Sequence, residues 1–241
     1  MSSKARHGRL WITRTRPQAE ATAERLRALG WTPVVAPVLE TRALDASDAA
    51  LMSAEGGGEA YDLAFTSQAA VAAFAALRGR RDLRVFVVGH ATGRAASEAG
   101  FTKVEGPRDG EAGDVEALAA RIALASPRPG LLLNPTAREP AADLEALLAQ
   151  RGISARSVAV YETVETPLAP PPENLEGLLV HSPGAARALA RLIPTEVAAA
   201  LSVWAISEAA AAPLRPLGFK QIFVAERPHE AAMLAQLHAH D

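Results

Sequence analysis

Residues 11–41, WITRTRPQAEATAERLRALGWTPVVAPVLET, decide the fold, because residues 133–163, LNPTAREPAADLEALLAQRGISARSVAVYET, repeat their pattern without a gap. Gly30 of the first copy aligns with Gly152 of the second, and each copy ends in Glu-Thr. The similarity between the two halves continues along the chain, since residues 64–77 resemble 179–192 and residues 87–101 resemble 205–219. An internal repeat of this kind predicts two similar lobes, with a cleft between them that can hold a ligand.

Short apolar segments alternate with helical ones, which is typical of parallel β-sheet. We expect strands at residues 10–12, 63–65, 85–88, 131–133, 178–180 and 202–206. The positions of proline and glycine support helices between these strands. Prolines are expected in first turns and glycines just past the last turns, at Pro17, Pro140, Gly30, Gly100, Gly152 and Gly218. The sequence therefore predicts an α/β fold built on parallel sheets.

Composition excludes several classes of protein. The chain has 241 residues, no cysteine and a net charge of -2, so thiol nucleophiles, disulfides and zinc-thiolate sites are ruled out. Few aromatics and no basic excess argue against a nucleic-acid partner. No apolar run is long enough to span a membrane, and the N-terminus does not read as a signal peptide. We expect a cytoplasmic protein.

In open parallel sheets, ligands bind outside the carboxyl ends of the strands, where helix N-termini offer free N–H groups. The rule selects six loops that are rich in small polar residues or glycine. The substrate-binding candidates are Thr13, Arg14, Thr66, Ser67, Gly89, Thr92, Ser182, Gly184, Ala185 and Ser207, with a further loop at Asn134-Pro135-Thr136. For any single loop, the plainer interpretation is that a hydroxyl side chain caps a helix. Six such loops facing one cleft would instead suit many carboxylates or phosphates.

No catalytic or metal-binding constellation competes with these loops. His90 and His181 follow strands but lack a partner at metal-ligand spacing, so we expect solvated polar residues. The segment from Gly89 to Gly93 lacks the full spacing of a nucleotide-binding loop. Tyr161 differs, because its phenol in the VAVYET connector would face the cleft as a donor. An aromatic anchor that joins the lobes is an equal alternative for Tyr161.

The order and spacing of several motifs resemble the uroporphyrinogen-III synthase family, cofactor-free enzymes of tetrapyrrole biosynthesis. The resemblance covers nearly the whole chain. The motifs are ITR at 12–14, FTSQAAV at 65–71, VGHATGRAASEAGF at 88–101, HSPGAA at 181–186 and VAERPHEAAMLAQL at 224–237.

The resemblance implies two parallel-sheet, flavodoxin-like domains joined by a two-stranded β connector. The first domain would comprise residues 1–36 and 166–241, the second residues 43–156, and the connector residues 37–42 and 157–165. Both Glu-Thr pairs would lie at this hinge. From composition alone, the proline run PLAPPP, residues 167–172, also marks an interdomain connection.

The resemblance also implies a lyase. Its substrate would be hydroxymethylbilane, a linear tetrapyrrole that closes to uroporphyrinogen III with loss of water and inversion of ring D. Uncatalysed closure gives the type I isomer, so the enzyme's main task is to fix the substrate's conformation. Tyr161 matches the family tyrosine proposed to assist loss of the hydroxyl. The implied protein is a monomer that needs no cofactor or metal and takes substrate by transient hand-over from the preceding pathway enzyme.

Two rival interpretations remain. The first is a bilobed small-molecule binding or regulatory protein without turnover, which an assay with the bilane distinguishes. The second is a nucleotide-binding α/β enzyme that uses the loop at Gly89. That enzyme would need a phosphate-binding lysine or a ribose-binding carboxylate after the loop, and neither is evident.

Overall fold

The computed structural model describes residues 8–16, 18–45, 47–54, 61–108, 111, 113–167 and 171–237. The chain divides into two compact units, of which unit 1 comprises Met1–Glu40 and Val164–Asp241 and unit 2 comprises Thr41–Thr163. Both boundaries fall inside strands, β3 (Leu39–Ala43) and β8 (Ser154–Glu165), which are neighbours in one sheet. The chain therefore passes between the units at the two Glu-Thr pairs.

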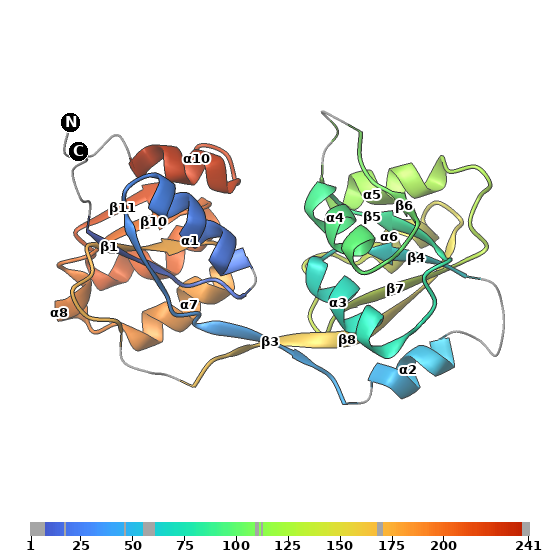
Figure 1. Cartoon of the computed structure of the whole chain (residues 1–241), viewed down its shortest axis with the longest axis horizontal. Helices are drawn as coiled ribbons and strands as arrows, with labels where there is room; N and C mark the ends of the chain where they lie inside the picture. The colour runs from blue at the N-terminus through green and yellow to red at the C-terminus, as the bar shows by residue number, and fades with distance from the viewer. Residues whose placement is uncertain are drawn as a thin grey trace. The chain divides into compact units, whose positions relative to one another are not determined.

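Unit 1 is built on a five-stranded sheet with the order β11-β10-β9-β1-β2, in which every neighbouring pair is parallel (Figure 1). Its elements are β1 (Arg9–Ile12), α1 (Gln18–Ala28), β2 (Thr32–Val35), β9 (Gly177–Val180), α7 (Pro183–Leu192), α8 (Thr195–Ala198), β10 (Ser202–Ala205), α9 (Glu208–Ala211), the 3-10 helix η1 (Ala212–Leu217), β11 (Gln221–Val224) and α10 (Glu230–Ala235).

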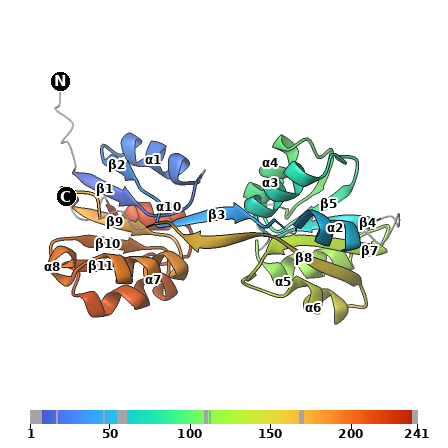
Figure 2. The same ribbon diagram turned by 90° about the horizontal axis from the view of Figure 1, so that it is seen from below.

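Helices cover both faces of this sheet. Leu26 of α1 and Met233 of α10 pack with Leu10 on one face, whereas Leu189 of α7 packs with Leu178 on the other. Figure 2 shows α1 and α7 on opposite sides of the strands. Because both faces are covered, every residue of β9 and β10 is buried, and all of them except Ser202 are apolar or glycine.

Unit 2 carries a six-stranded sheet with the order β3-β8-β7-β4-β5-β6. Helices α3 and α4 lie on one face and α5 and α6 on the other (Figure 2). Beyond β3 and β8, the elements are α2 (Ser47–Ala54), β4 (Tyr61–Phe65), α3 (Gln68–Leu77), β5 (Arg84–Val87), α4 (His90–Glu98), β6 (Lys103–Glu105), α5 (Val115–Ala123), β7 (Leu131–Ala137) and α6 (Leu144–Ala149).

The strand pairing follows the repeat in the sequence. In unit 1, Arg9 of β1 pairs with Thr32 of β2, and in unit 2 the aligned residues Leu131 and Ser154 pair in the same way. The next strand along is also parallel in both sheets. The predicted α/β architecture of parallel sheets in two units is confirmed. That the repeat arose by duplication stays a prediction.

Local signals place most helix ends correctly. Gly30, Gly100, Gly152 and Gly218 all adopt positive φ, between 67° and 94°, which glycine adopts without steric cost. The expectation of Pro140 in a first turn is wrong. Helix α6 begins at Leu144, because the Asp143 carboxylate accepts the Ala146 amide at 2.9 Å and caps the helix there. Pro17 lies outside the described residues.

Two further expectations are corrected by long-range pairing. Asn134-Pro135-Thr136 is not a loop, because β8 continues beside these residues and extends β7 to Ala137. The proline run at 167–172 does not carry the crossing between units, because the boundary already lies at Thr163 within β8. Thr166 is bonded within unit 1, where its amide donates to the Val38 carbonyl at 3.1 Å. Residues 168–170 of the run lie outside the described residues.

Candidate functional site

Serine side chains at the carboxyl ends of the strands cap the helices that follow. Ser67, Ser182 and Ser207 each accept the backbone N–H three residues on, at 3.1, 3.1 and 3.3 Å. Gly89 is the N-cap residue before α4 and provides no side-chain cap. The three serine hydroxyls therefore act as helix caps, which was the plainer interpretation of these residues. Since a cap of this kind satisfies only one of a helix's first N–H groups, other first-turn amides remain able to bind an anion.

Three candidate residues are buried. Thr13 is fully buried, and its hydroxyl donates to the Leu179 carbonyl at 2.7 Å, so it links β1 to β9. Thr92 is 5% exposed within α4. Ala185 is fully buried, and its amide is the one taken by the Ser182 cap. These small residues therefore contribute to packing and capping, and a part for them in substrate binding stays a prediction.

Tyr161 is a partly buried residue of β8 that packs against an apolar cluster of unit 2. Its hydroxyl lies 3.0 Å from the Ser67 hydroxyl, at the carboxyl end of β4. Tyr161 lies opposite Ala137 across an irregularity in the β7–β8 ladder. The sequence named both hydroxyl residues but did not predict that they touch. The contact puts Tyr161 among the candidate loops of unit 2.

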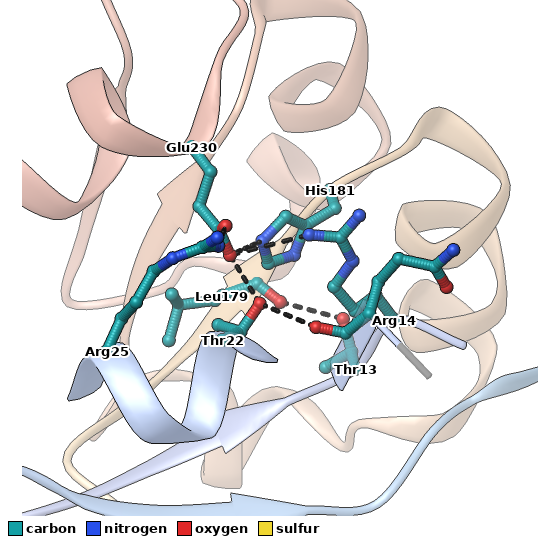
Figure 3. Close-up of polar contacts among 8 residues, drawn as sticks. Thr13, Arg14, Thr22, Arg25, Leu179, His181 and Glu230 are labelled. Carbon is teal, nitrogen blue, oxygen red and sulfur yellow. Dashed lines mark hydrogen bonds and ion pairs between the residues drawn. The ribbon is translucent and has the colours of Figure 1, made fainter. Parts of the chain in front are cut away.

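His181 follows β9 and is buried, which corrects the expectation of a solvated side chain. Its side chain is 5% exposed, and Nε2 lies 3.2 Å from Glu230 Oε1. Thr22 and Arg25 also donate to this carboxylate, and Arg14 lies 3.4 Å from it. Figure 3 shows the Glu230 carboxylate between Arg25 on one side and His181 and Arg14 on the other. The five side chains, which we call the Glu230 cluster, come from α1, α10 and the ends of β1 and β9.

Burial and hydrogen bonding set the protonation of the Glu230 cluster. Burial by itself would raise the pKa of Glu230, but hydrogen bonds from His181 and Thr22, together with nearby positive charge, lower it to about 2. Burial is also the largest effect on His181 and lowers its pKa. At neutral pH the cluster therefore holds one carboxylate, two guanidinium groups and a neutral imidazole, with a surplus of positive charge.

A separate groove of about 1080 Å³ lies in unit 2, between α2 and β8. Arg138, Glu145, Arg156 and Glu162 line it together with small residues. Its charged groups have partners nearby: Arg138 pairs with Glu162 at 2.8 Å, and Glu145 accepts the Ser157 amide at 2.7 Å. None of the strand-end candidate residues lines this groove, so it gives no support to the predicted site.

Within the described ranges, no three His, Asp or Glu side chains gather in a way that could hold a metal ion. No helix in the same part of the chain is long and apolar enough to cross a membrane.

Glu230 is the residue that sequence reasoning missed. It lies in the terminal segment VAERPHEAAMLAQL, at the first position of α10, where an acidic residue is ordinary for a helix start. Its partners Thr22, Arg25 and His181 stand 208, 205 and 49 positions away in the chain. No local pattern could have paired them.

Comparisons with known proteins agree with one another. A family model described as "Uroporphyrinogen-III synthase HemD" matches residues 20–235. The chain is similar to the uroporphyrinogen-III synthetase of Helicobacter pylori, with a TM-score of 0.62 and 17% identity over 96% of this chain and 99% of that one. It is also similar to a mutant uroporphyrinogen III synthase of Thermus thermophilus, with a TM-score of 0.52 and 19% identity over 97% and 98% of the two chains. No curated protein matches.

Proposed function

Because the chain belongs to the uroporphyrinogen-III synthase family, whose members are lyases, we propose that it closes hydroxymethylbilane to uroporphyrinogen III. The single observation that carries this function is the family match over residues 20–235. The family gives a small-molecule tetrapyrrole as the class of substrate, and hydroxymethylbilane is the specific member that we propose.

The reaction begins when the bilane's hydroxymethyl carbon loses its hydroxyl group, which leaves as water once it has gained a proton. The resulting azafulvene is attacked by the substituted carbon of ring D. The spiro intermediate then rearranges and loses a proton, so that one water is released overall and ring D is inverted. Attack at the unsubstituted carbon would give the type I isomer. The enzyme therefore has to control which carbon reaches the electrophile.

Tyr161 is our proposed proton donor for the leaving hydroxyl, because a donor must lie within hydrogen-bond reach of that oxygen. Its contact with Ser67 at 3.0 Å keeps the phenol at the carboxyl end of β4, where ligands bind in this class of sheet. Substrate carboxylates would be bound by first-turn amides, including that of Gly184, and by Arg14, Thr66, Ser67, Gly89, Ser182 and Ser207.

We further propose that the enzyme acts as a cytoplasmic monomer, without cofactor or metal, and receives the bilane by transient hand-over from the enzyme that makes it. The absence of cysteine suits a reducing compartment. Sedimentation of the purified chain tests the monomer, and the rate of product formation with the bilane-forming enzyme present or absent tests the hand-over.

The decisive experiment supplies hydroxymethylbilane to the purified protein in the presence of a chelator. Product is oxidised to porphyrin, and the type I and type III isomers are separated and measured. We expect mainly type III, formed faster than the blank. Type I alone, at the blank rate, would contradict the proposal and leave the chain as a binding protein without turnover.

A further inference from the structure

Glu230 is the centre of a polar cluster at the carboxyl edge of the unit 1 sheet. Its side chain is 13% exposed and contacts Thr22, Arg25, His181 and Arg14. Three of these partners hold the carboxylate firmly: Thr22 and Arg25 donate from α1, and His181 donates from the end of β9. The carboxylate is therefore fixed by the fold and is not a freely moving surface charge.

The direction of the His181 bond follows from the charge on Glu230. An ionised carboxylate can only accept hydrogen bonds, so His181 Nε2 carries the proton and donates it. Nδ1 is then an unprotonated acceptor, and it is buried without a partner among the described residues. A neutral His181 adds no charge to the cluster. Its effect on Glu230 is to orient the carboxylate.

Arg14 differs from the other partners, because much of its guanidinium is uncommitted. Ile12 pairs with Leu179 in the ladder between β1 and β9, so Arg14 and His181 each lie two residues past the last pair. The Arg14 side chain is 27% exposed, and its one recorded contact in the described part of the chain is Nη1 to Glu230 at 3.4 Å. A guanidinium has five N–H donors, so several remain for a ligand.

The charges of the cluster favour an anion as that ligand. Arg25 pairs closely with Glu230, which leaves the positive charge of Arg14 largely unbalanced. A planar guanidinium with free donors binds a carboxylate through two parallel hydrogen bonds. The proposed substrate carries carboxylates on every ring. Its negative charge therefore complements the positive charge of the Arg14 guanidinium.

We propose that Glu230 is a positioning residue, which Thr22, Arg25 and His181 fix so that it holds the guanidinium of Arg14 for one carboxylate of the tetrapyrrole substrate. The inference rests on the proposed function. It assigns to helix α10 a part in substrate binding through Arg14.

The test compares kcat and KM for type III formation in the full-length enzyme carrying Arg14→Gln, Glu230→Gln or both changes. Loss of a charge-assisted hydrogen bond pair should raise KM of Arg14→Gln by about tenfold to a hundredfold, with kcat nearly unchanged, because binding of a remote carboxylate is the same in the ground and transition states. Glu230→Gln should raise KM by about threefold to tenfold, since the guanidinium is kept but loses its orientation. The double variant should resemble Arg14→Gln alone.

The sign of the Glu230→Gln effect separates positioning from simple electrostatics. Removing a negative charge next to an anion site would by Coulomb attraction strengthen substrate binding and lower KM. Positioning predicts the opposite change. A KM that is unchanged or lower in Glu230→Gln would overturn the proposal, and so would effects of the two variants that multiply in the double variant.

Thr22→Val and Met233→Ala provide matched comparisons. Thr22→Val removes a donor to Glu230 without changing any charge, and should raise KM in the same direction as Glu230→Gln. Met233 packs in the apolar core on the same helix and makes no polar contact with Glu230 through its apolar side chain, so Met233→Ala should lower Tm but leave KM unchanged. A rise in KM for Met233→Ala would mean that loosening α10 is enough to weaken substrate binding. That result would refute a specific role for Glu230. If wild-type enzyme forms no type III isomer, the proposed function itself fails.

Discussion

Replacing Tyr161 by phenylalanine separates a chemical role of its hydroxyl from a structural one. Among the residues that the structure describes, this hydroxyl has one hydrogen-bond partner, the Ser67 hydroxyl at 3.0 Å. Loss of one neutral hydrogen bond should cost about 0.5–1.5 kcal/mol of unfolding free energy. The apolar contacts of the ring are kept, so the protein should remain folded.

The effect on turnover should be larger than the effect on stability. If the phenol protonates the leaving hydroxyl, Tyr161→Phe should lower kcat by about tenfold to a thousandfold, the range expected for a positioned proton donor. Urea unfolding gives the stability change, and type III formation at saturating bilane gives kcat. Unchanged kcat in a variant that has lost about 1 kcal/mol of stability would refute the chemical role and leave Tyr161 as a packing residue.

Ser67→Ala is the informative partner of this variant. The Ser67 hydroxyl also accepts the Ala70 amide and caps α3, so its removal should cost about 1 kcal/mol for the cap in addition to the bond with Tyr161. The double variant loses the shared bond only once. Its loss of unfolding free energy should therefore be about 1 kcal/mol smaller than the sum of the losses in the two single variants. Strict additivity would show that the 3.0 Å contact contributes nothing.

Two further predictions follow from burial. Gly177→Ala should destabilise the protein by about 3 kcal/mol or more, measured by urea unfolding, because a Cβ at this position would lie 2.6 Å from the Trp204 ring and closer still to the Ser202 carbonyl of β10; a loss below about 1 kcal/mol would show that β10 can move aside. Stability should also fall on acidification. The pKa of His181 is lowered by folding, so just below pH 6.5 the unfolded chain binds a proton that the folded chain does not, and the folded state loses stability. The pKa of Glu230 is lowered from its ordinary value of 4.5 to about 2, so the stability that this carboxylate contributes is lost as the pH falls from 4.5 to about 2. Urea midpoints that decline from pH 7.5 to 5.5 as steeply in His181→Gln as in wild type would contradict the part assigned to His181.

Features that depend on neighbouring residues could be predicted from the sequence. Alternating apolar and helical segments predicted the parallel sheets, because a central strand such as β9 is buried on both faces and a helix such as α7 on only one. Glycines predicted helix ends, and helix capping was the plainer of two interpretations of the serines after strands, since both effects act over three or four residues. The order of motifs along the chain was enough to indicate the family.

Tertiary structure decided what depends on residues far apart in the chain. Asn134 and its neighbours became strand because β8 pairs with them, although their composition is that of a loop. The side chains of His181 and Thr13 are buried beside residues distant in the chain, since His181 contacts Glu230 of α10 and Thr13 bonds to Leu179 of β9, and burial by distant elements leaves no local signature. For the same physical reason Glu230 was missed: its four partners are brought together only when α1 and α10 pack on one face of the folded sheet.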